Sequence, residues 1–298
     1  MDIISMRGME KKQVEDILKL ASKFEKGGAS NTLKGKILAT LFFEPSTRTR
    51  FSFESAMKRL GGTCVGFSSI EGTSVKKGET LIDTVNIMSG YSDCIVIRHS
   101  KEGAAKLASE HSSVPIVNAG DGSHDHPTQT LLDLYTIKKS LKNFNGLRVG
   151  ICGDLRYGRT GRPLSIALSN YDTEISFISP PQLSMDKSTV KYIRDNGTNV
   201  KEVLKIEDVI RELDVLYMTR IQRERFPTEE EYLKFSGHYI VNKELMNLAK
   251  KNMILMHPLP RVNEISVEVD SDPRAKYFEQ SRNGVPTRMA VLYTAMKK

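Results

Sequence analysis

Short, nearly continuous apolar segments alternate with helical segments along the chain, and this alternation constrains the fold more than any other feature. KILATLFF, TCVGFS, DCIVIRH and VPIVNAG occur in the first half, and LRVGICGD, EISFIS, NVKEV, DVLYMT and MILMHPLP in the second. Strands that are apolar on both faces and separated by helices are typical of parallel sheets covered on both sides. We therefore predict an α/β fold with two parallel sheets, each flanked by helices.

The two series of apolar segments indicate two domains, and 298 residues are enough for two domains of ordinary size. The helical segment PTQTLLDLYTIKKSL, residues 127–141, lies between the two series. We place the boundary in this helix, with residues 1–133 in the first domain and residues 134–283 in the second. A last amphipathic helix, residues 284–298, must pack on one of the two.

The net charge of +8 suggests an anionic partner. Nucleic-acid binding would need a clustered basic stripe. Here many basic residues occur as scattered pairs without interleaved aromatic residues, such as Lys11–Lys12, Lys138–Lys139 and Lys250–Lys251. We therefore interpret most lysines as solvated and favour an anionic small molecule over nucleic acid.

The sequence also indicates where the protein works. No apolar run reaches the length of a membrane span, and the segment MDIISMRGMEKKQVED lacks the basic and apolar regions of a signal peptide. Cys64, Cys94 and Cys152 are odd in number and far apart, without a C-x-x-C motif. We expect a cytoplasmic protein with reduced thiols and no membrane association.

Polar segments directly follow the apolar runs in both halves of the chain. In parallel α/β sheets ligands bind at the carboxyl ends of the strands. We therefore expect these segments to contribute to one composite binding site. They are EPSTRTR, RH, NAGDGSHDHPTQ, GDLRYGRT, TRIQRER and HPLPR.

The segment FFEPSTRTR, residues 42–50, joins an apolar run to a helical one. A helix N-terminus offers unpaired N–H groups and a positive dipole end, to which Ser46, Thr47, Arg48 and Thr49 add donors and a charge. A plain N-cap needs one such residue, and a P-loop would need glycines and Gly-Lys-Ser/Thr. The segment therefore predicts a phosphate site.

Two other motifs could suggest different chemistry. HDH at residues 124–126 has no further His or Cys nearby, which makes a weak metal-ligand set. The glycines of GICGDLRYGRTG do not have the G-x-G-x-x-G spacing of a dinucleotide site. We predict neither a metal ion nor a cofactor.

Seven motifs occur in order over nearly the whole chain. Together they resemble the aspartate/ornithine carbamoyltransferase family, whose members have two α/β domains with the active site in the cleft between them. The motifs are FFEPSTRTRFSFE, KKGET, RH, NAGDGSHDHPTQTLLD, GDLRYGRT, YMTRIQRERF and HPLPR.

The resemblance implies that the first domain binds carbamoyl phosphate and that the C-terminal helix packs back on this domain. Residues 46–49 would hold the phosphate, and Arg98 would contact both the phosphate and the carbamoyl oxygen. His126 would polarise that oxygen and Gln129 would contact the carbamoyl amide. Arg48, Thr49, Arg98, His126, Gln129 and Lys77 are then the predicted catalytic residues.

The resemblance also implies how the second substrate binds. Arg159 and Arg220 would hold the two carboxylates of aspartate, with Gln222 as a further contact. Arginine pairs bidentately with carboxylates, and this arginine cluster would repel the cationic side chain of ornithine. Leu259 and Pro260, joined by a cis peptide bond, would receive the carbamoyl amide and the incoming amine on their carbonyls.

Partners follow from the same resemblance. Ser74 and Lys77 match a loop that reaches into the active site of the neighbouring subunit, so a homotrimer with shared sites is expected. Glu44 and Glu224 would bridge to arginines when the domains close. Some relatives also assemble with a zinc-bearing regulatory chain. The segment GRPLSIALS departs from the family pattern at Gly161–Arg162–Pro163, directly after Arg159.

We predict transfer of a carbamoyl group from carbamoyl phosphate to aspartate, a step of pyrimidine biosynthesis. Three alternatives are a carbamoyltransferase for another amino acid, a nucleic-acid-binding protein, and an inactive homologue that acts as a scaffold. Each predicted catalytic side chain is present, which argues against the last of these.

Overall fold

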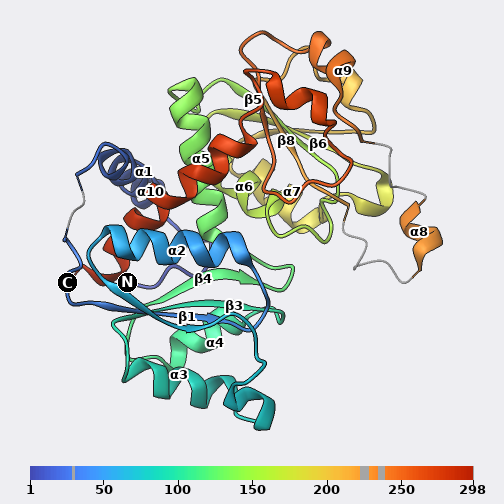
Figure 1. Cartoon of the computed structure of the whole chain (residues 1–298). Coiled ribbons are helices and arrows are strands. Elements are labelled where there is room, and N and C mark those ends of the chain that lie inside the picture. The colour runs from blue at the N-terminus through green and yellow to red at the C-terminus, as the bar shows by residue number, and fades with distance from the viewer. Residues whose placement is uncertain (29–30, 222–227, 234–238, 298) are drawn as a thin grey trace. The chain divides into compact units, whose positions relative to one another are not determined.

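The computed structural model describes residues 1–28, 31–221, 228–233 and 239–297 (Figure 1). The chain divides into two compact units. Unit 1 comprises Met1–Tyr135 and Asn283–Lys298, and unit 2 comprises Thr136–Arg282. Two helices, α5 (Pro127–Leu141) and α10 (Tyr277–Met296), cross this division.

Unit 1 contains a four-stranded parallel sheet in the order β2-β1-β3-β4. Helices α3 and α4 cover one face of this sheet, and α2 lies on the other (Figure 1). The sequence order is α1 (Lys11–Glu25), β1 (Ile37–Phe42), α2 (Thr47–Arg59), β2 (Thr63–Phe67), the short 3₁₀ helix η1 (Ser74–Lys77), α3 (Leu81–Ser89), β3 (Cys94–His99), α4 (Ala104–His111) and β4 (Ile116–Asp121).

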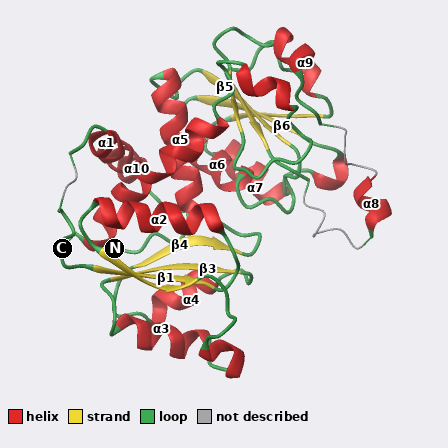
Figure 2. Cartoon of the chain, in the orientation of Figure 1, coloured by secondary structure: helices red, strands yellow, loops and turns green. Residues whose placement is uncertain are grey.

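Unit 2 contains a five-stranded parallel sheet in the order β7-β6-β5-β8-β9, drawn in yellow in Figure 2. Its core gathers apolar residues of β5, β6 and β8 with others from the segments that follow them. The elements are β5 (Leu147–Cys152), α6 (Gly161–Leu168), β6 (Thr173–Ile178), η2 (Pro181–Leu183), α7 (Lys187–Asp195), β7 (Asn199–Val203), η3 (Ile206–Asp208), β8 (Val215–Met218), α8 (Glu229–Leu233), α9 (Lys243–Leu248), β9 (Ile254–Met256) and η5 (Val267–Ser271).

Helix α1 shows how a sequence pattern becomes packing. Five of its apolar residues recur at helical spacing and are buried on the face that the sequence predicts: Val14, Ile17, Leu18, Ala21 and Phe24. Phe24 packs edge-on against Tyr293 of α10, with ring centroids 5.7 Å apart. The hydroxyl of Tyr135 on α5 donates to Glu25 at 2.6 Å. These contacts join α1 to the parts of α5 and α10 that belong to unit 1.

The structure corrects two expectations. Most strands are buried on both faces as predicted, including β4 and β9 at one edge of each sheet, but β2 and β7 at the other edges are largely exposed. Each of β2 and β7 has a neighbouring strand on one side only, and charged residues such as Lys201 and Glu202 keep β7 solvated. The last helix begins at Tyr277, several residues before the predicted start, and continues through Pro286.

Three further sequence expectations concern thiols, membranes and metals. Cys64, Cys94 and Cys152 are free thiols, and the last two are buried in β3 and β5. No helix within the described residues combines the length and apolar character needed to cross a membrane. The same residues contain no group of three or more His, Cys, Asp or Glu side chains arranged to hold a metal ion.

Candidate active site

The phosphate motif lies at the start of α2, directly after β1. Ser46 is the N-cap residue of the helix by its backbone, but its side chain makes no capping hydrogen bond. The hydroxyl is therefore available to a ligand, as are the first N–H groups of the helix. Thr47 and Arg48 are exposed, and Thr49 is buried. This geometry argues against the plain N-cap that was the alternative.

The next arginine of the segment has a structural role. Arg50 Nε lies 2.7 Å from Glu54 Oε1 one turn further along α2. Such i,i+4 pairs stabilise an exposed helix face by a few tenths of a kcal/mol, roughly 0.2–0.5 kcal/mol. Because its guanidinium is paired with Glu54, we do not count Arg50 among the residues that offer groups to an anion.

Arg98 lies at the end of β3, beside the end of β1. Phe42 is its partner in the parallel ladder, and the Phe43 N–H donates to the Arg98 carbonyl at 2.9 Å. Its guanidinium is buried and donates from Nη1 to the Ala119 carbonyl at 3.1 Å and from Nη2 to Glu44 Oε1 at 2.9 Å. The fold thereby fixes a cation at the carboxyl ends of β1 and β3, where the phosphate motif begins.

Glu44 is a predicted domain-closure residue, and the structure pairs it with Arg98 of the same unit. A carboxylate that accepts from a guanidinium restricts the orientation of the guanidinium plane. Glu44 therefore orients Arg98 in this structure.

His126 and Gln129 lie at the start of α5, after β4. Both side chains are buried, with exposed fractions of 5% and 9%. The Thr128 hydroxyl lies 3.5 Å from His126 Nδ1. A neutral imidazole carries its proton on one of its two ring nitrogens, so His126 can act as a hydrogen-bond donor as well as an acceptor.

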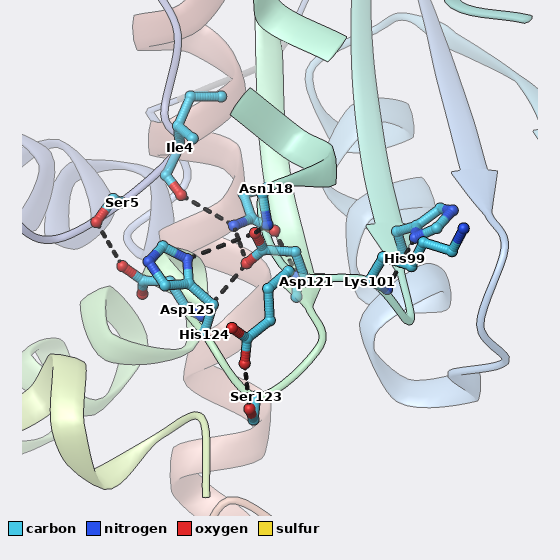
Figure 3. A network of polar contacts seen from close by, with 12 residues as sticks. Ile4, Ser5, His99, Lys101, Asn118, Asp121, Ser123, His124 and Asp125 are labelled. Carbon is cyan, nitrogen blue, oxygen red and sulfur yellow. Dashed lines mark hydrogen bonds and ion pairs between the residues drawn. The ribbon is translucent and has the colours of Figure 1, made fainter. Parts of the chain in front are cut away.

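A polar network holds the loop between β4 and α5 (Figure 3). Asp121 accepts from the Asn118 side chain at 2.9 Å and from the Gly103 N–H at 2.9 Å, and its Oδ2 lies 3.5 Å from His124 Nδ1. Burial opposes ionisation of Asp121, but these hydrogen bonds outweigh it and lower its pKa. His124 is thus committed to a carboxylate of its own loop.

Asp125 ties the same loop to the N-terminal segment. Its Oδ2 accepts from the Ser5 hydroxyl at 2.6 Å and from the Met6 N–H at 3.0 Å. Burial raises the pKa of this carboxyl, although the two hydrogen bonds act against the rise. Asp121 and Asp125 together therefore fix the backbone that leads into His126.

A buried cluster supports Gln129. Its Nε2 donates to Asp133 Oδ1 at 2.9 Å, one helical turn later, and Asp133 is fully buried. Because a carboxylate only accepts hydrogen bonds, the Gln129 carbonyl oxygen is left for a ligand. Burial lowers the pKa of nearby Arg288 to about 10, an effect that Asp133 opposes and Arg98 reinforces.

Sequence reasoning missed Asp133 and Arg288. The spacing of Gln129 and Asp133, four residues apart on a helix, was a usable signal. Arg288 offered none, because it is distant in sequence and its guanidinium lies 5.0 Å from the Phe53 ring inside unit 1.

The predicted shared loop contains η1. Ser74 and Lys77 are exposed at its first and last positions. Lys76 forms an ion pair with Glu71. The loop thus presents Ser74 and Lys77 to solvent.

Unit 2 places Arg159 after β5 and Arg220 after β8, at the carboxyl ends of neighbouring strands. Arg220 lines a pocket together with Thr219, Ile221, Tyr232, Tyr239, Val262, Asn263 and Glu264. This lining brings the segment after β8 next to the segment that follows HPLPR.

The departure at residues 161–163 is accommodated locally. Helix α6 begins at Gly161, and Pro163 stands in its first turn, where its missing N–H is not needed. Arg162 Nε lies 3.2 Å from Asp186 Oδ2. Arg162 is thus engaged with α7's N-cap residue.

The HPLPR segment follows β9. The Leu259–Pro260 peptide bond is cis, as the resemblance implied, and Leu259 has a φ of +56°. The buried His257 ring contacts both the Leu259 N–H and Glu264. His257 and Glu264 were not among the predicted site residues. Gln222 and Glu224 lie outside the described residues.

Comparisons with known proteins agree over both units. Residues 1–139 match the family model "Aspartate/ornithine carbamoyltransferase, carbamoyl-P binding domain", and residues 145–295 match the corresponding "Asp/Orn binding domain". The aspartate carbamoyltransferase catalytic subunit of Thermococcus onnurineus is 56% identical over 295 residues, covering 98% of this chain and 95% of the relative. That of Clostridium acetobutylicum is 53% identical over 288 residues, covering 95% and 94%.

Solved structures give the same result. The catalytic subunit of M. jannaschii aspartate transcarbamoylase has a TM-score of 0.92 at 48% identity, covering 99% of this chain and 98% of that one. The Trypanosoma cruzi enzyme in complex with carbamoyl phosphate and aspartate has a TM-score of 0.92 at 37% identity, covering 99% and 95%. Because both family models match and relatives more than half identical align over nearly its whole length, the chain belongs to the aspartate/ornithine carbamoyltransferase family.

Proposed function

We propose that this protein transfers the carbamoyl group of carbamoyl phosphate to the amino group of L-aspartate. The products are N-carbamoyl-L-aspartate and phosphate, and the step belongs to de novo pyrimidine biosynthesis. One observation carries the proposal. The chain is 56% identical to an aspartate carbamoyltransferase catalytic subunit over nearly its whole length, and the side chains predicted to bind anions and polarise a carbonyl follow its strands.

Unit 1 supplies the groups for carbamoyl phosphate. The α2 N-terminus, with Ser46, Thr47, Arg48 and Thr49, binds the phosphate, and Arg98 adds a fixed cation beside it. Phosphate is the leaving group, so negative charge grows on it as the reaction proceeds. Donors and cations that are already in place stabilise that charge without rearranging, and one such donor is typically worth ~3 kcal/mol.

His126 and Gln129 act on the carbamoyl group itself. His126 donates from Nε2 to the carbonyl oxygen, on which charge develops when the amine attacks. Gln129 accepts from the carbamoyl NH₂ through its carbonyl oxygen, because its own NH₂ is held by Asp133. The two residues together present the carbamoyl carbon to the nucleophile.

Unit 2 supplies the groups for aspartate. Arg159 and Arg220 bind its two carboxylates, with Gln222 as a further contact, and Lys77 comes from a neighbouring subunit. Ornithine would need an acidic partner for its side-chain ammonium. Glu264 is an acidic residue in the Arg220 pocket, but its oxygens already accept from His257 and from two backbone N–H groups. Because these bonds already engage both oxygens of Glu264, the pocket favours aspartate over ornithine.

The reaction needs no covalent enzyme intermediate. The neutral amine of aspartate attacks the carbamoyl carbon, and the C–N bond forms as its lone pair is donated. The C–O bond to phosphate then breaks, its electron pair leaves with the phosphate, and the amine loses one proton. The carbonyls of Leu259 and Pro260 receive the N–H groups of the carbamoyl amide and of the incoming amine, which aligns the lone pair with the carbon.

A substrate comparison tests the proposal. Purified protein is incubated with carbamoyl phosphate and either aspartate, ornithine or N-acetylornithine, and the carbamoylated product and phosphate are both measured. We expect equal amounts of carbamoyl-aspartate and phosphate, and turnover with ornithine near background. Faster turnover with ornithine or N-acetylornithine would contradict the assignment of aspartate.

The assembly is part of the proposal. Exposed Ser74 and Lys77 complete a neighbour's site, so the working unit is a cytoplasmic homotrimer that can also bind a regulatory chain, as the name "catalytic subunit" of the relatives suggests. Mixing inactive Lys77→Ala and Arg48→Ala chains after reversible dissociation should restore some intact sites and measurable activity. If the mixture stays as inactive as the separate variants, the sites are not shared. Native mass with and without a co-expressed partner chain tests the regulatory assembly.

A further inference from the structure

We propose that His257 and Glu264 are a positioning pair that holds the backbone of Pro258–Leu259–Pro260 in place for the reaction. The inference rests on the proposed function, in which the carbonyls of Leu259 and Pro260 receive N–H groups of the substrates. Neither side chain needs to touch a substrate. Both act through the backbone of this segment.

The contacts form one connected chain inside unit 2. The Leu259 N–H donates to His257 Nδ1 at 2.8 Å, and His257 Nε2 lies 2.7 Å from Glu264 Oε1. The other oxygen of Glu264 accepts from the N–H groups of Val262 and Asn263, at 3.0 and 3.1 Å. The side chains of His257 and Glu264 are 1% and 8% exposed, so water does not compete for these bonds.

Donor and acceptor rules fix the direction of the whole chain. A backbone N–H can only donate, so His257 Nδ1 must be the acceptor and the ring proton must sit on Nε2. Nε2 then donates to Glu264, which must accept on both oxygens. Burial opposes ionisation of Glu264, but the hydrogen bonds lower its pKa, so it is a carboxylate at neutral pH.

The pair is itself anchored at both ends. The His257 N–H donates to the side-chain oxygen of Gln280 on α10 at 2.9 Å, and Gln280 is 1% exposed. The Glu264 carbonyl accepts from the Val241 N–H at 2.9 Å. The backbones of His257 and Glu264 are therefore both held in place. The His257 ring, which contacts Glu264, can in turn hold the Leu259 N–H in position.

Leu259 is the residue that needs such support. Its φ of +56° lies in the left-handed region, which residues other than glycine adopt only when the surroundings hold them there. Losing the acceptor for its N–H would let the segment relax toward commoner backbone angles. The Leu259 and Pro260 carbonyls would then move away from the groups they are proposed to receive.

Two substitutions separate the halves of the pair. The oxygen of His257→Asn can stand in for Nδ1 and accept from Leu259, whereas the NH₂ of His257→Gln can stand in for Nε2 and donate to Glu264. If the contact with Leu259 matters, His257→Asn should retain kcat/KM for aspartate within about tenfold, while His257→Gln should lose about a hundredfold, as sub-ångström to ångström misplacement does. Binding of inorganic phosphate, which unit 1 provides, should not change in either variant.

Wild-type turnover is measured first, because a wild type without aspartate carbamoylation refutes the proposed function rather than the pair. With an active wild type, equal losses in the two variants, or a larger loss in His257→Asn, would overturn the inference. Thermal unfolding of both variants shows whether either loss comes from general destabilisation.

Hydrogen exchange gives a test that does not need the variants to fold. Pro258 and Pro260 have no amide hydrogen, so the Leu259 N–H is the single exchangeable backbone amide within residues 258–260. Mass spectrometry of fragments that differ by these residues isolates its exchange in the wild-type protein. We expect exchange many times slower than in an unfolded peptide. Exchange at the unfolded rate would overturn the inference whatever the variants do.

Discussion

Substituting Asp133 with asparagine should impair the reaction although the residue does not contact a substrate. Asp133 is fully buried, and its Oδ1 accepts from the Gln129 amide at 2.9 Å. As a carboxylate it forces the Gln129 NH₂ toward itself and leaves the Gln129 oxygen for the carbamoyl amide. Asparagine offers both a donor and an acceptor, so this orientation would no longer be enforced.

The magnitude follows from the type of bond. A hydrogen bond to a charged group contributes roughly 1.5–3 kcal/mol, and a neutral one about 1 kcal/mol. The difference is on the order of 1.4 kcal/mol, which corresponds to about a tenfold loss of kcat/KM for carbamoyl phosphate. The free energy of unfolding should also fall by ~1–3 kcal/mol, because Arg288, a buried cation, loses a compensating negative charge.

A double-mutant cycle tests whether Asp133 acts through Gln129. Steady-state kinetics are measured for Gln129→Ala, Asp133→Asn and the double variant, with the exposed substitution Asp16→Asn as a control for the loss of one carboxylate. We expect Asp133→Asn to cost little further activity once Gln129 is alanine. A tenfold loss that persists in the Gln129→Ala background would refute the reasoning, because the two effects would be independent.

Three further predictions concern the two units separately. Gly153→Ala should lower the free energy of unfolding by ~2–4 kcal/mol and raise the KM for aspartate, because its φ is +116° and a Cβ would lie 2.2 Å from the carbonyl oxygen of Thr219, the neighbour of Arg220. Arg220→Lys should raise the KM for aspartate about tenfold or more and leave the KM for carbamoyl phosphate unchanged, since lysine lacks the bidentate fork. The stabilisation from Asp121, whose pKa is lowered from 3.8, should be fully present above pH 3.8 and be lost as the pH falls through the lower folded-state value. The difference in unfolding free energy between wild type and Asp121→Asn, measured in urea, should therefore be constant above pH 3.8 and shrink as the pH falls below it.

Each of the three has a result that contradicts it. Gly146→Ala is a control for the first, because Gly146 also has a positive φ but a Cβ there meets no atom within 4 Å, so a similar loss at both sites would rule out the clash. Equal changes of both KM values in Arg220→Lys would place the effect outside the aspartate pocket. A stability difference for Asp121→Asn that is constant with pH would show that the carboxylate's charge contributes nothing.

Much of the architecture could be predicted from the sequence because it depends on local patterns. The strands coincide with apolar runs, and α5 coincides with the predicted helix at residues 127–141. The exposed edge strands β2 and β7 were the exception, because a segment such as NVKEV does not show by itself that it will have a neighbouring strand on one side only. The early start of α10 was hidden by Asn283, Gly284 and Pro286, which are weak helix formers that the helix nevertheless contains.

The residues of the candidate site likewise fall into those that could be predicted from the sequence and those that could not. Residues that offer groups to a ligand cluster in recognisable motifs, and the structure places those of unit 1 at neighbouring strand ends. Supporting residues such as Arg288 and Glu264 reach the site through tertiary packing, so no short motif identifies them. Asp133 differs, because it lies one helical turn after Gln129 on the same helix. The support of His257 likewise depends on Gln280 of α10, which accepts from the His257 N–H. Gln280 is distant in sequence, so HPLPR by itself does not reveal this contact.

The most direct test of the account is the rate of product formation with carbamoyl phosphate and each of the two family amino acids, aspartate and ornithine. We expect stoichiometric carbamoyl-aspartate and phosphate with aspartate, and a rate with ornithine at least a hundredfold lower, of the order that a missing charge partner imposes on discrimination. A comparable or faster rate with ornithine, or phosphate release without a carbamoylated product, would contradict the account.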